Sequence, residues 1–274
     1  FNNESVREFS IIQGTTRCAN NDWCGHLFKA LEGALVLEKL SLEKLATHLN
    51  DLTMYMESFL KASNKLRTLS FNSSDGILVN FNAIRYSESL EILDISHTKN
   101  LRPYSYMLNT GTQWGDSKTL KRFIAPGALI PSKNLRNPPR SLEYLDISQN
   151  YITYSRGTDS GFLNSTFVAW TEKLPNLTHL DISKNGFSSL NSICEFIANT
   201  KTLRTLKIFE GSWIKGNTTD FLYLFPLDCF EKNTSIIECD HPTNNRTKAV
   251  QIREYIKRNR QTHCCSLTKA AGRK

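Results

Sequence analysis

The chain has 274 residues, 39% of them hydrophobic and 22% charged, which is ordinary for a folded protein and excludes wholesale disorder. No stretch approaches the roughly 18 consecutive apolar residues that a membrane-spanning helix needs. The formal net charge of +8 lies entirely in the segment 246–274, which holds nine Lys and Arg and the single acid Glu254. The rest of the chain is balanced, so the charge does not indicate a body that binds nucleic acid.

A repeat of the form L-x-x-L-x-L, with Val, Ile or Phe allowed, runs through most of the sequence. Successive copies begin 22 to 35 residues apart, so the repeat is leucine-rich in type and irregular in length. The copy LKRFIA is the most degenerate. The eight copies begin at Val6, Leu37, Leu66, Leu90, Leu120, Leu142, Leu177 and Leu203.

The spacing of the repeat predicts a short strand in each copy, because residues two apart on a strand point the same way. One copy buries only a thin apolar wedge, and stacked neighbours complete the core. We therefore expect an α/β leucine-rich-repeat solenoid with a curved parallel β-sheet on its concave face and an irregular, partly helical convex side. The buried positions of the clearest copies are Leu93, Ile95, Leu145, Ile147, Leu180, Ile182, Leu206 and Ile208.

The connections between the strands are of two kinds. Apolar residues at helical spacing predict helices, and polar Gly-containing stretches predict surface loops. In chain order, helices are predicted at 26–34, 55–63, 192–202 and 248–260, and loops at 109–118 and 155–167. These elements suggest a solenoid over residues 1–225, a Cys-rich C-terminal cap over 226–265 and an unstructured tail over 266–274.

In its fuller form this repeat carries an Asn in the turn that follows its last strand leucine, where the side-chain amide can satisfy backbone groups of that turn. Asn150 and Asn185 fill that position. The other copies place different residues there, so we expect a less regular solenoid. They are Leu45, Ser74, Thr98, Ala128 and Gly211.

Cysteine spacing favours disulfides over zinc, because no paired C-x2-C is present. Cys18 and Cys24 are close together, and we expect them to form a bridge. Four late cysteines are expected to form two bridges, which leaves Cys194 unpaired and buried in a convex-side helix. The late cysteines are Cys229, Cys239, Cys264 and Cys265.

Seven Asn-x-Ser/Thr sequons exceed the number expected by chance and favour the secretory route. A glycan on Asn72 would cover part of the concave face in the early repeats. The predicted glycosylation sites are Asn3, Asn72, Asn164, Asn176, Asn217, Asn233 and Asn245.

The copies at Leu90, Leu142 and Leu177, with their L-D-I-S cores and a following Asn or Thr, resemble the ectodomains of Toll-like receptors. The irregular repeat length, dense sequons and Cys-rich end fit that group, over about residues 6–209. Val6 already begins a repeat, and residues 1–10 lack the features of a signal peptide, so we expect a piece of a longer ectodomain. The resemblance also implies a cap in which Cys229 and Cys239 pair with Cys264 and Cys265, although the C-x-C opening usual in that cap is missing.

The resemblance implies an extracellular recognition module of an innate-immune receptor, secreted or at the cell surface as part of a longer membrane protein. Its partners would be a protein or microbial ligand, a second receptor copy in a dimer, and a polyanion at the basic C-terminal segment. The alternative is a secreted matrix or adhesion protein with the same solenoid and no signalling role.

Strand positions between the leucines face solvent and are candidates for ligand contact, as are Thr68, Ile92 and Ile124. We expect binding along the repeats that begin at Leu142, Leu177 and Leu203, or otherwise on a lateral edge. Trp114, in the loop before Leu120, either touches a partner or anchors its own loop. The predicted ligand-binding residues are Tyr144, Asp146, His179, Asp181, Lys207, Phe209 and Trp114.

Two polar sets have a simpler interpretation. Asp94, Asp146 and Asp181 share one strand position and could line up to bind a cation, but soluble residues are ordinary at an exposed position. His179, Asp181 and Ser183 have the residue types of a catalytic triad, yet side chains at i, i+2 and i+4 of one strand project side by side. We predict no catalytic residues, no metal site and no cofactor.

Overall fold

The protein is described from a computed structural model, which covers residues 5–12, 23–32, 34–44, 52–74, 81–98, 113–128, 130, 135, 137–150, 162–187, 190–214, 224–240 and 245–271. The predictions for Asn3, Cys18, Cys24, Asn164 and Asn217 lie outside the described side chains. The chain forms two compact units, residues 1–150 and residues 151–274, and each is taken by itself.

Unit 1 contains six parallel strands that pair in chain order, with each strand in register with the next. In β3, β4 and β6 a repeat leucine lies at the centre of the register: Leu69, Leu93 and Leu145. The strands are β1 (Glu8–Ile12), β2 (Lys39–Glu43), β3 (Thr68–Ser70), β4 (Ile92–Asp94), β5 (Arg122–Ile124) and β6 (Tyr144–Asp146).

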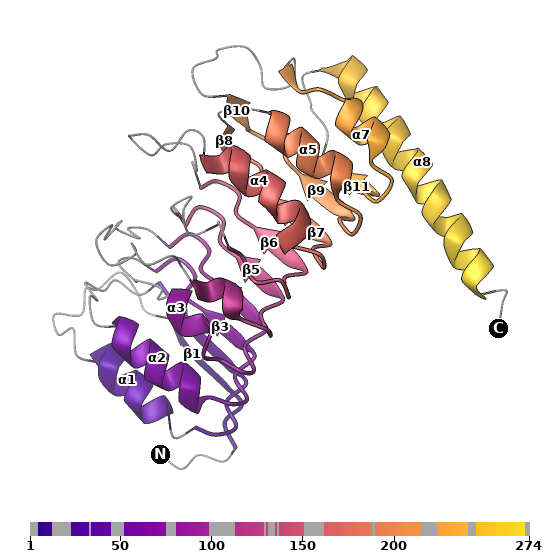
Figure 1. The fold of residues 1–274 in the computed structure, drawn as a ribbon. Coiled ribbons are helices and arrows are strands. Elements are labelled where there is room, and N and C mark those ends of the chain that lie inside the picture. Colours follow the sequence, from indigo (N-terminus) through magenta and orange to yellow (C-terminus); the bar gives the residue numbers. More distant parts are fainter. Residues whose placement is uncertain are drawn as a thin grey trace. The chain divides into compact units, whose positions relative to one another are not determined.

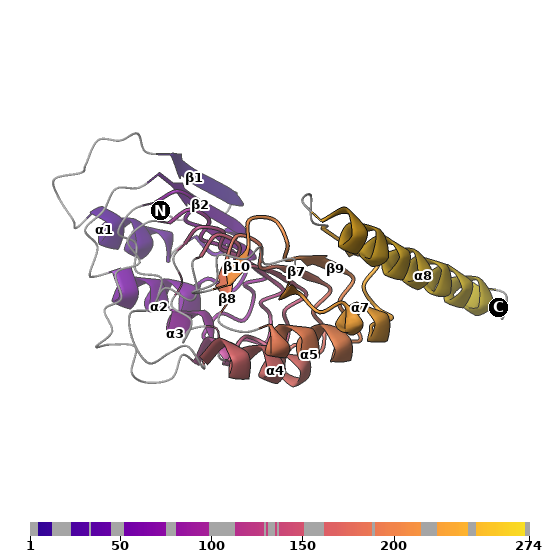
Figure 2. The same ribbon diagram turned by 90° about the horizontal axis from the view of Figure 1, so that it is seen from above.

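The helices of unit 1 lie together on one side of these strands (Figures 1 and 2). They are α1 (Trp23–Leu31), α2 (Leu52–Ala62), α3 (Phe81–Ile84) and the 3-10 helix η1 (Gln113–Asp116). Between the two layers, Phe28 of α1 packs on Phe59 of α2 with ring centroids 5.2 Å apart.

Unit 2 repeats this arrangement with three parallel strands, β7 (His179–Asp181), β9 (Thr205–Lys207) and β11 (Glu238–Cys239). A second, two-stranded sheet joins β8 (Gly186–Phe187) to β10 (Trp213–Ile214). The helices α4, α5 and α7 lie on one side of the strands, as Figure 2 shows. The helices of this unit are α4 (Phe162–Lys173), α5 (Asn191–Asn199), α7 (Asp228–Lys232) and α8 (Arg246–Ala271).

The expected fold class is confirmed: parallel strands carry the repeat leucines, and helices cover the other side. A strand begins two residues after the start of each of the eight predicted repeats, including the degenerate copy at Leu120. The eight side chains predicted to be buried are all at most 2% exposed. Strand β11 was not predicted, because its sequence I-I-E-C has Cys239 where the second leucine is expected.

The turns after β2, β3, β4, β5, β6 and β7 each hold one residue in a left-handed backbone conformation. His97, Gln149 and Lys184 have φ between 54° and 58°, and Gly127 has φ 64° at the same repeat position. The side chain of the next residue, at the position predicted for Asn, donates hydrogen bonds to backbone carbonyls of the turn, for example in two repeats. The Asn150 amide donates to the carbonyls of Ala125 and Ser148 at 2.8 and 2.9 Å, and Thr98 donates to the carbonyl of Ile95.

The repeat at Leu203 departs from this register by one residue. Gly211 takes the left-handed conformation with φ 59°, and the hydroxyl of Ser212 donates to the carbonyl of Ile208. The prediction that Gly211 fills the Asn position is therefore wrong, because the turn holds one extra residue and Ser212 takes that role.

Two predicted loops are different in the structure. Residues 162–167, predicted as part of a loop, begin helix α4, because Phe167 and Trp170 pack into the core against Phe196. Residues 113–116 form η1. The predicted unstructured tail is helical as far as Ala271, since α8 continues through it. Among the described helices, none combines the length and the apolar character that a membrane span requires.

Candidate recognition surface

Strand residues that alternate with the buried leucines form an exposed face on β4, β5 and β6. The register places Ile92, Arg122 and Tyr144 side by side, and Asp94, Ile124 and Asp146 in the next row. The guanidinium of Arg122 lies over the ring of Tyr144, 4.7 Å from its centroid. Ile92, Ile124 and Tyr144 are only half-buried. We call Ile92, Arg122, Ile124 and Tyr144 the strand patch.

The Asp column has a structural role in the turns. Oδ1 of Asp146 accepts hydrogen bonds from the backbone N–H and the hydroxyl of Ser148, at 3.0 and 2.8 Å. Asp181 accepts the same pair from Ser183 at 3.0 and 2.7 Å, and Asp94 accepts it from Ser96. The alternative interpretation of the column, an ordinary structural choice at this position, agrees with these contacts.

Two predicted contact residues are buried, so their assignment to the ligand surface is wrong. Trp114 is fully buried and meets Phe123 edge-on with ring centroids 5.0 Å apart, which agrees with the alternative that it anchors its own loop. Phe209 packs against Phe225 and Phe230, at 5.1 and 6.2 Å. Phe209 lies six residues after the start of its repeat, and the equivalent residues Ser96 and Ser148 are buried as well, so this position does not continue the exposed face of the strand.

The other predicted residues of unit 2 are accessible. His179 and Lys207 are exposed on β7 and β9, and Lys207 Nζ lies 3.7 Å from Asp181 Oδ2. The His179 ring lies 2.7 Å from the Thr178 hydroxyl. Tyr144 and Asp146 belong to unit 1, where Tyr144 contacts Arg122 and Asp146 holds the turn after β6.

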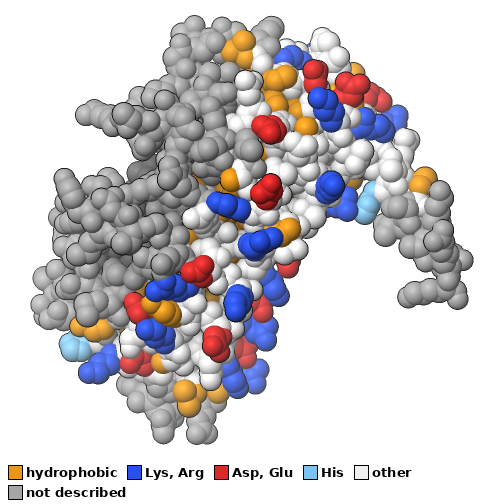
Figure 3. All heavy atoms as spheres, viewed as in Figure 1, with side chains coloured by type: hydrophobic (Ala, Val, Ile, Leu, Met, Phe, Trp, Pro, Cys, Tyr) orange, Lys and Arg blue, Asp and Glu red, His pale blue; other side chains and the backbone are white. Residues whose placement is uncertain are grey.

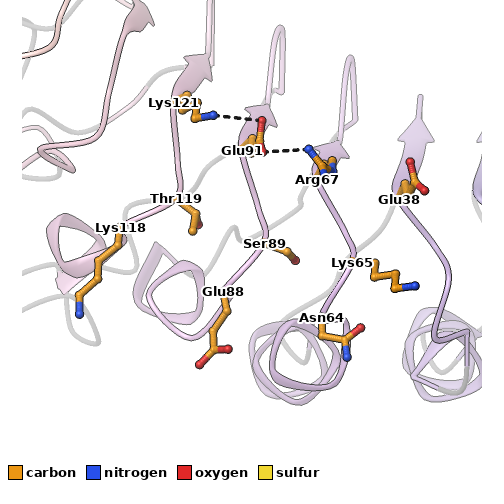
Figure 4. Close-up of a pocket in the computed structure, with 10 residues that line it drawn as sticks. All are labelled: Glu38, Asn64, Lys65, Arg67, Glu88, Ser89, Glu91, Lys118, Thr119 and Lys121. Atoms are coloured by element: carbon orange, nitrogen blue, oxygen red, sulfur yellow. Dashed lines mark hydrogen bonds and ion pairs between the residues drawn. The ribbon is translucent and has the colours of Figure 1, made fainter.

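A row of alternating charges precedes the strands of unit 1 and was not recognised in the sequence. Each residue lies immediately before the exposed strand position: Glu38, Arg67, Glu91 and Lys121. Glu91 pairs with Arg67 at 3.2 Å and with Lys121 at 3.5 Å (Figure 4). In the repeats of unit 1, the residue after the first apolar residue of the repeat changes the sign of its charge from one copy to the next, and this pattern could have revealed the row in the sequence.

This row forms one wall of a groove of about 580 Å³ along the edge of the strands. The outer wall carries Lys65, Glu88 and Lys118, which lie apart from the paired row in Figure 4. All three are exposed, and none forms an ion pair with another described residue. Figure 3 shows acidic and basic side chains interspersed over the described face. We call this feature the edge groove.

The edge groove is banded by charge. The repeat at Leu66 contributes Lys65 and Arg67, the next contributes Glu88 and Glu91, and the third contributes Lys118 and Lys121. Neighbouring parallel strands lie about 4.8 Å apart, so the sign of the surface alternates at about that interval. The ion pairs within the row hold its side chains in place, and the outer charges are left to solvent or a partner.

Asp240, which was also not predicted, closes the end of the strand ladder in unit 2. Its carboxylate accepts hydrogen bonds from the backbone N–H groups of Ile208, Phe209 and Glu210 at 2.8, 2.8 and 2.9 Å. In an earlier turn, the N–H groups of Ile95 and His97 donate to carbonyls of the next repeat instead. Burial raises the pKa of Asp240 above its ordinary value, although the three N–H groups act in the opposite direction.

The basic helix α8 is used in part to seal unit 2. The Arg258 guanidinium donates to the carbonyls of Phe230, Glu231 and Asn233, and Arg260 donates to the carbonyl of Ile237 at 2.6 Å. Lys248 Nζ donates to the carbonyl of Phe225 at 2.7 Å, and partial burial lowers the pKa of this lysine. Cationic side chains commonly satisfy the last carbonyls of a helix in this way.

The two predicted late disulfides are not formed in the structure. Cys229, Cys239 and Cys265 are free thiols, so no two bridges can be drawn among the four late cysteines. Cys194 lies in helix α5, as predicted, but it is only half-buried and adjoins Cys229. Parity of a cysteine count cannot reveal such a contact, because it depends on how two helices pack.

The sequon at Asn233 is buried, so its assignment as a glycosylation site is wrong. Its amide donates to the carbonyls of Ile197 and Thr200 at 2.7 and 3.1 Å, and its oxygen accepts from the N–H of Ser235 and of Ile236. The side chain is 1% exposed and leaves no room for a sugar. Asn176 is exposed, and Asn72 and Asn245 are half-buried.

Comparison with known proteins supports the repeat. A family model described as Leucine Rich Repeat matches residues 176–198. Protein CARMIL of Dictyostelium discoideum is 27% identical over 172 residues, which cover 60% of this chain and 16% of that protein. The chain thus spans about a sixth of the length of that relative.

Two solved structures are similar to the chain at low identity. A TLR13–ssRNA13 complex is 17% identical with a TM-score of 0.47, covering 86% of this chain and 32% of that one. An internalin (InlF) of Listeria monocytogenes is 15% identical with a TM-score of 0.39, covering 77% and 62%.

The strands, the turns and the matched repeat together define a leucine-rich-repeat fold. The family model that matches describes a repeat, which is typical of protein-binding modules.

Proposed function

We propose that the chain recognises a protein partner through unit 1, with the strand patch at the centre of the contact and the edge groove at its border. The observation that carries this proposal is the strand patch itself. It places a tyrosine, an arginine and two half-buried isoleucines on neighbouring strands. Tyr and Arg are among the residues enriched at the energetic centres of protein interfaces.

The position of the edge groove supports the same surface. Glu91 and Lys121 directly precede Ile92 and Arg122 along the chain, so the charged row borders the apolar centre. Protein interfaces commonly combine an apolar centre with a polar rim, and the rim sets orientation more than affinity.

The banding favours a helical segment in the partner. A helix rises 5.4 Å per turn, close to the strand spacing of about 4.8 Å, so residues at i, i+4 and i+7 can face three successive repeats. A matching face carries acid, base and acid at those positions, opposite Lys65, Glu88 and Lys118. In an extended peptide, side chains on one face are two residues and about 6.7 Å apart, so it fits the spacing of about 4.8 Å less well.

A receptor ectodomain remains the finer form of this proposal, with a matrix or adhesion protein as its alternative. The resemblance to Toll-like receptors and the remaining sequons support an extracellular place. The free thiols of Cys229 and Cys239 and the buried Asn233 do not add to that support. Both forms use the same surface, and neither depends on a polyanion at α8, where Lys248, Arg258 and Arg260 already contact carbonyls.

The experiment compares partner binding by the full chain and by the double variant Ile92→Ala/Tyr144→Ala. Affinity capture with both baits identifies a partner, and its dissociation constant is then measured with each purified chain. We expect the double variant to bind at least tenfold more weakly, because hot-spot truncations each cost more than about 1 kcal/mol.

The control is Leu35→Ala/Val250→Ala, which removes two exposed apolar side chains elsewhere. It should bind like the unmodified chain. If a correctly folded Ile92→Ala/Tyr144→Ala chain binds its partner within twofold of the unmodified one, the strand patch is not the recognition surface. A parallel His179→Ala/Lys207→Ala variant then tests the exposed group of unit 2.

A further inference from the structure

Two cysteines on neighbouring helices meet in unit 2. Cys194 lies on α5 and Cys229 lies in α7, and these helices pack against each other. Both thiols reach the same acceptor, the carbonyl oxygen of Pro226, and Cys194 lies close enough to raise the pKa of the Cys229 thiol. This oxygen lies 3.2 Å from Cys229 Sγ and 4.0 Å from Cys194 Sγ.

We infer that Cys194 and Cys229 form a disulfide when the protein is oxidised, a covalent link between helices α5 and α7. Their side chains are the two thiols that the packing of these helices brings into contact. Cys239, by contrast, hydrogen-bonds Asp240 at the end of the strand ladder, and Cys265 is exposed on α8.

The chemistry requires a two-electron oxidant, for which hydrogen peroxide suffices. The sulfur of Cys194 attacks one peroxide oxygen, the O–O bond breaks, and sulfenic acid and one water form. The sulfur of Cys229 then attacks the sulfenic sulfur, the S–S bond forms and the hydroxyl leaves as a second water. Both cysteines are oxidised by one electron each, and the peroxide is reduced to two waters.

The two thiols have different access to the oxidant. Cys194 is half-exposed, so it is the residue that meets the peroxide first. Contact with Cys194 and burial raise the pKa of the Cys229 thiol, which keeps it protonated near neutral pH. Because the thiolate is the nucleophile, the second step should be faster at alkaline pH.

The link would stabilise unit 2, since it closes the loop from Cys194 to Cys229 and restricts the unfolded chain. We expect oxidation to raise the melting temperature by about 5 °C or more, and a reductant to reverse the rise.

The test oxidises the purified full chain with hydrogen peroxide, blocks the remaining thiols at acid pH and digests it with trypsin without reduction. Mass spectrometry should find the peptide of residues 185–201 joined to that of residues 216–232, lighter than their sum by two hydrogens. Cys194→Ser and Cys229→Ser should each abolish the joined peptide and the rise in melting temperature. Cys239→Ser is the matched control and should keep both.

Three results would overturn the inference. One is a joined peptide that connects Cys194 or Cys229 to another cysteine in the unmodified chain. Another is oxidation of Cys265 to completion while Cys194 and Cys229 both remain open to alkylation. The third is a rise in melting temperature that persists in the Cys194→Ser chain.

Discussion

The left-handed residue after each strand is the most demanding single position of the repeat. A left-handed conformation costs a non-glycine residue about 1–2 kcal/mol, and glycine avoids that cost. At Gly127 a Cβ atom would also lie 3.1 Å from Nδ1 of His97. We therefore expect Gly127→Ala to lower the free energy of unfolding by about 1–2 kcal/mol.

The opposite change at the equivalent position tests the same argument. Gln149 has φ 58°, so Gln149→Gly should leave stability unchanged or raise it by up to about 1 kcal/mol, the gain being reduced by the greater freedom of glycine in the unfolded chain. Both values come from denaturant titrations. A Gln149→Gly chain less stable by more than 1 kcal/mol would show that the side chain, not the backbone, matters there.

The repeat leucines are expected to be sensitive to truncation. Leu180 is 2% exposed and lies at the centre of the register between His179 and Asp181. Leu180→Ala should cost about 2–5 kcal/mol, because it leaves a cavity in a packed core. Leu224, which is 42% exposed, is the matched control, and Leu224→Ala should cost no more than about 0.5 kcal/mol.

Asn233 should carry no glycan even when the chain is expressed through the secretory pathway. The folded structure uses its amide for four hydrogen bonds to the backbone, and a sugar on Nδ2 would replace one of the two hydrogens that this atom donates. Enzymatic deglycosylation in heavy-oxygen water converts each occupied Asn to labelled Asp. The label is expected at the exposed Asn176 and not at Asn233, and a labelled Asn233 in folded protein would contradict the assignment.

At the scale of elements, the end of the strand ladder depends on Asp240. Asp240→Ala removes the acceptor of three backbone N–H groups, and an unsatisfied buried donor costs about 1–3 kcal/mol. We expect a loss of about 2–3 kcal/mol in the free energy of unfolding. Asp240→Asn keeps one oxygen acceptor and should cost less.

The pH dependence of this contribution follows from the raised pKa of Asp240. A carboxyl group whose pKa is higher in the folded state than in the unfolded state stabilises the protein most at a pH below its unfolded pKa, about 3.9. This stabilisation is lost as the pH rises through the pKa of the folded state. Asp240→Asn removes this titration. As the pH rises above about 4, the unmodified chain should therefore lose stability relative to the Asp240→Asn chain.

The sequence predicts elements well where each depends on its own few residues. The strand of the Leu120 copy forms despite the degenerate core F-I-A, because Phe123 fills the site of the second leucine. Helix α4 was missed because its apolar residues, Phe167 and Trp170, follow a polar run and become a pattern only once Phe196 packs on them. The shift at Gly211 depends on one inserted residue, which the spacing of the leucines does not reveal.

The predictions for the candidate site were right or wrong for the same reason. Exposure of Tyr144, His179 and Lys207 follows from strand alternation and was predictable. Burial of Trp114 and Phe209 depends on contacts with Phe123, Phe225 and Phe230 that are not local in sequence. The contact between Cys194 and Cys229 likewise depends on the packing of two helices.

For the whole molecule, the banding of the edge groove is expected to control how a partner orients. The triple variant Lys65→Glu/Glu88→Lys/Lys118→Glu reverses the sign of the outer wall in all three repeats. These side chains are exposed and form no ion pair with another described residue, so the fold should be preserved. The association rate should fall at least tenfold, because charges at an interface rim act on the encounter.

The matched control applies the same three exchanges to exposed residues of unit 2, as Glu195→Lys/Lys201→Glu/Lys232→Glu. Both triple variants change the net charge of the chain equally, so a general effect of charge would weaken binding in both. Association rates are measured at two salt concentrations, since screening should shrink the difference between the groove variant and the unmodified chain. Equal rates for the two triple variants would exclude the edge groove from recognition and leave the strand patch to account for it alone.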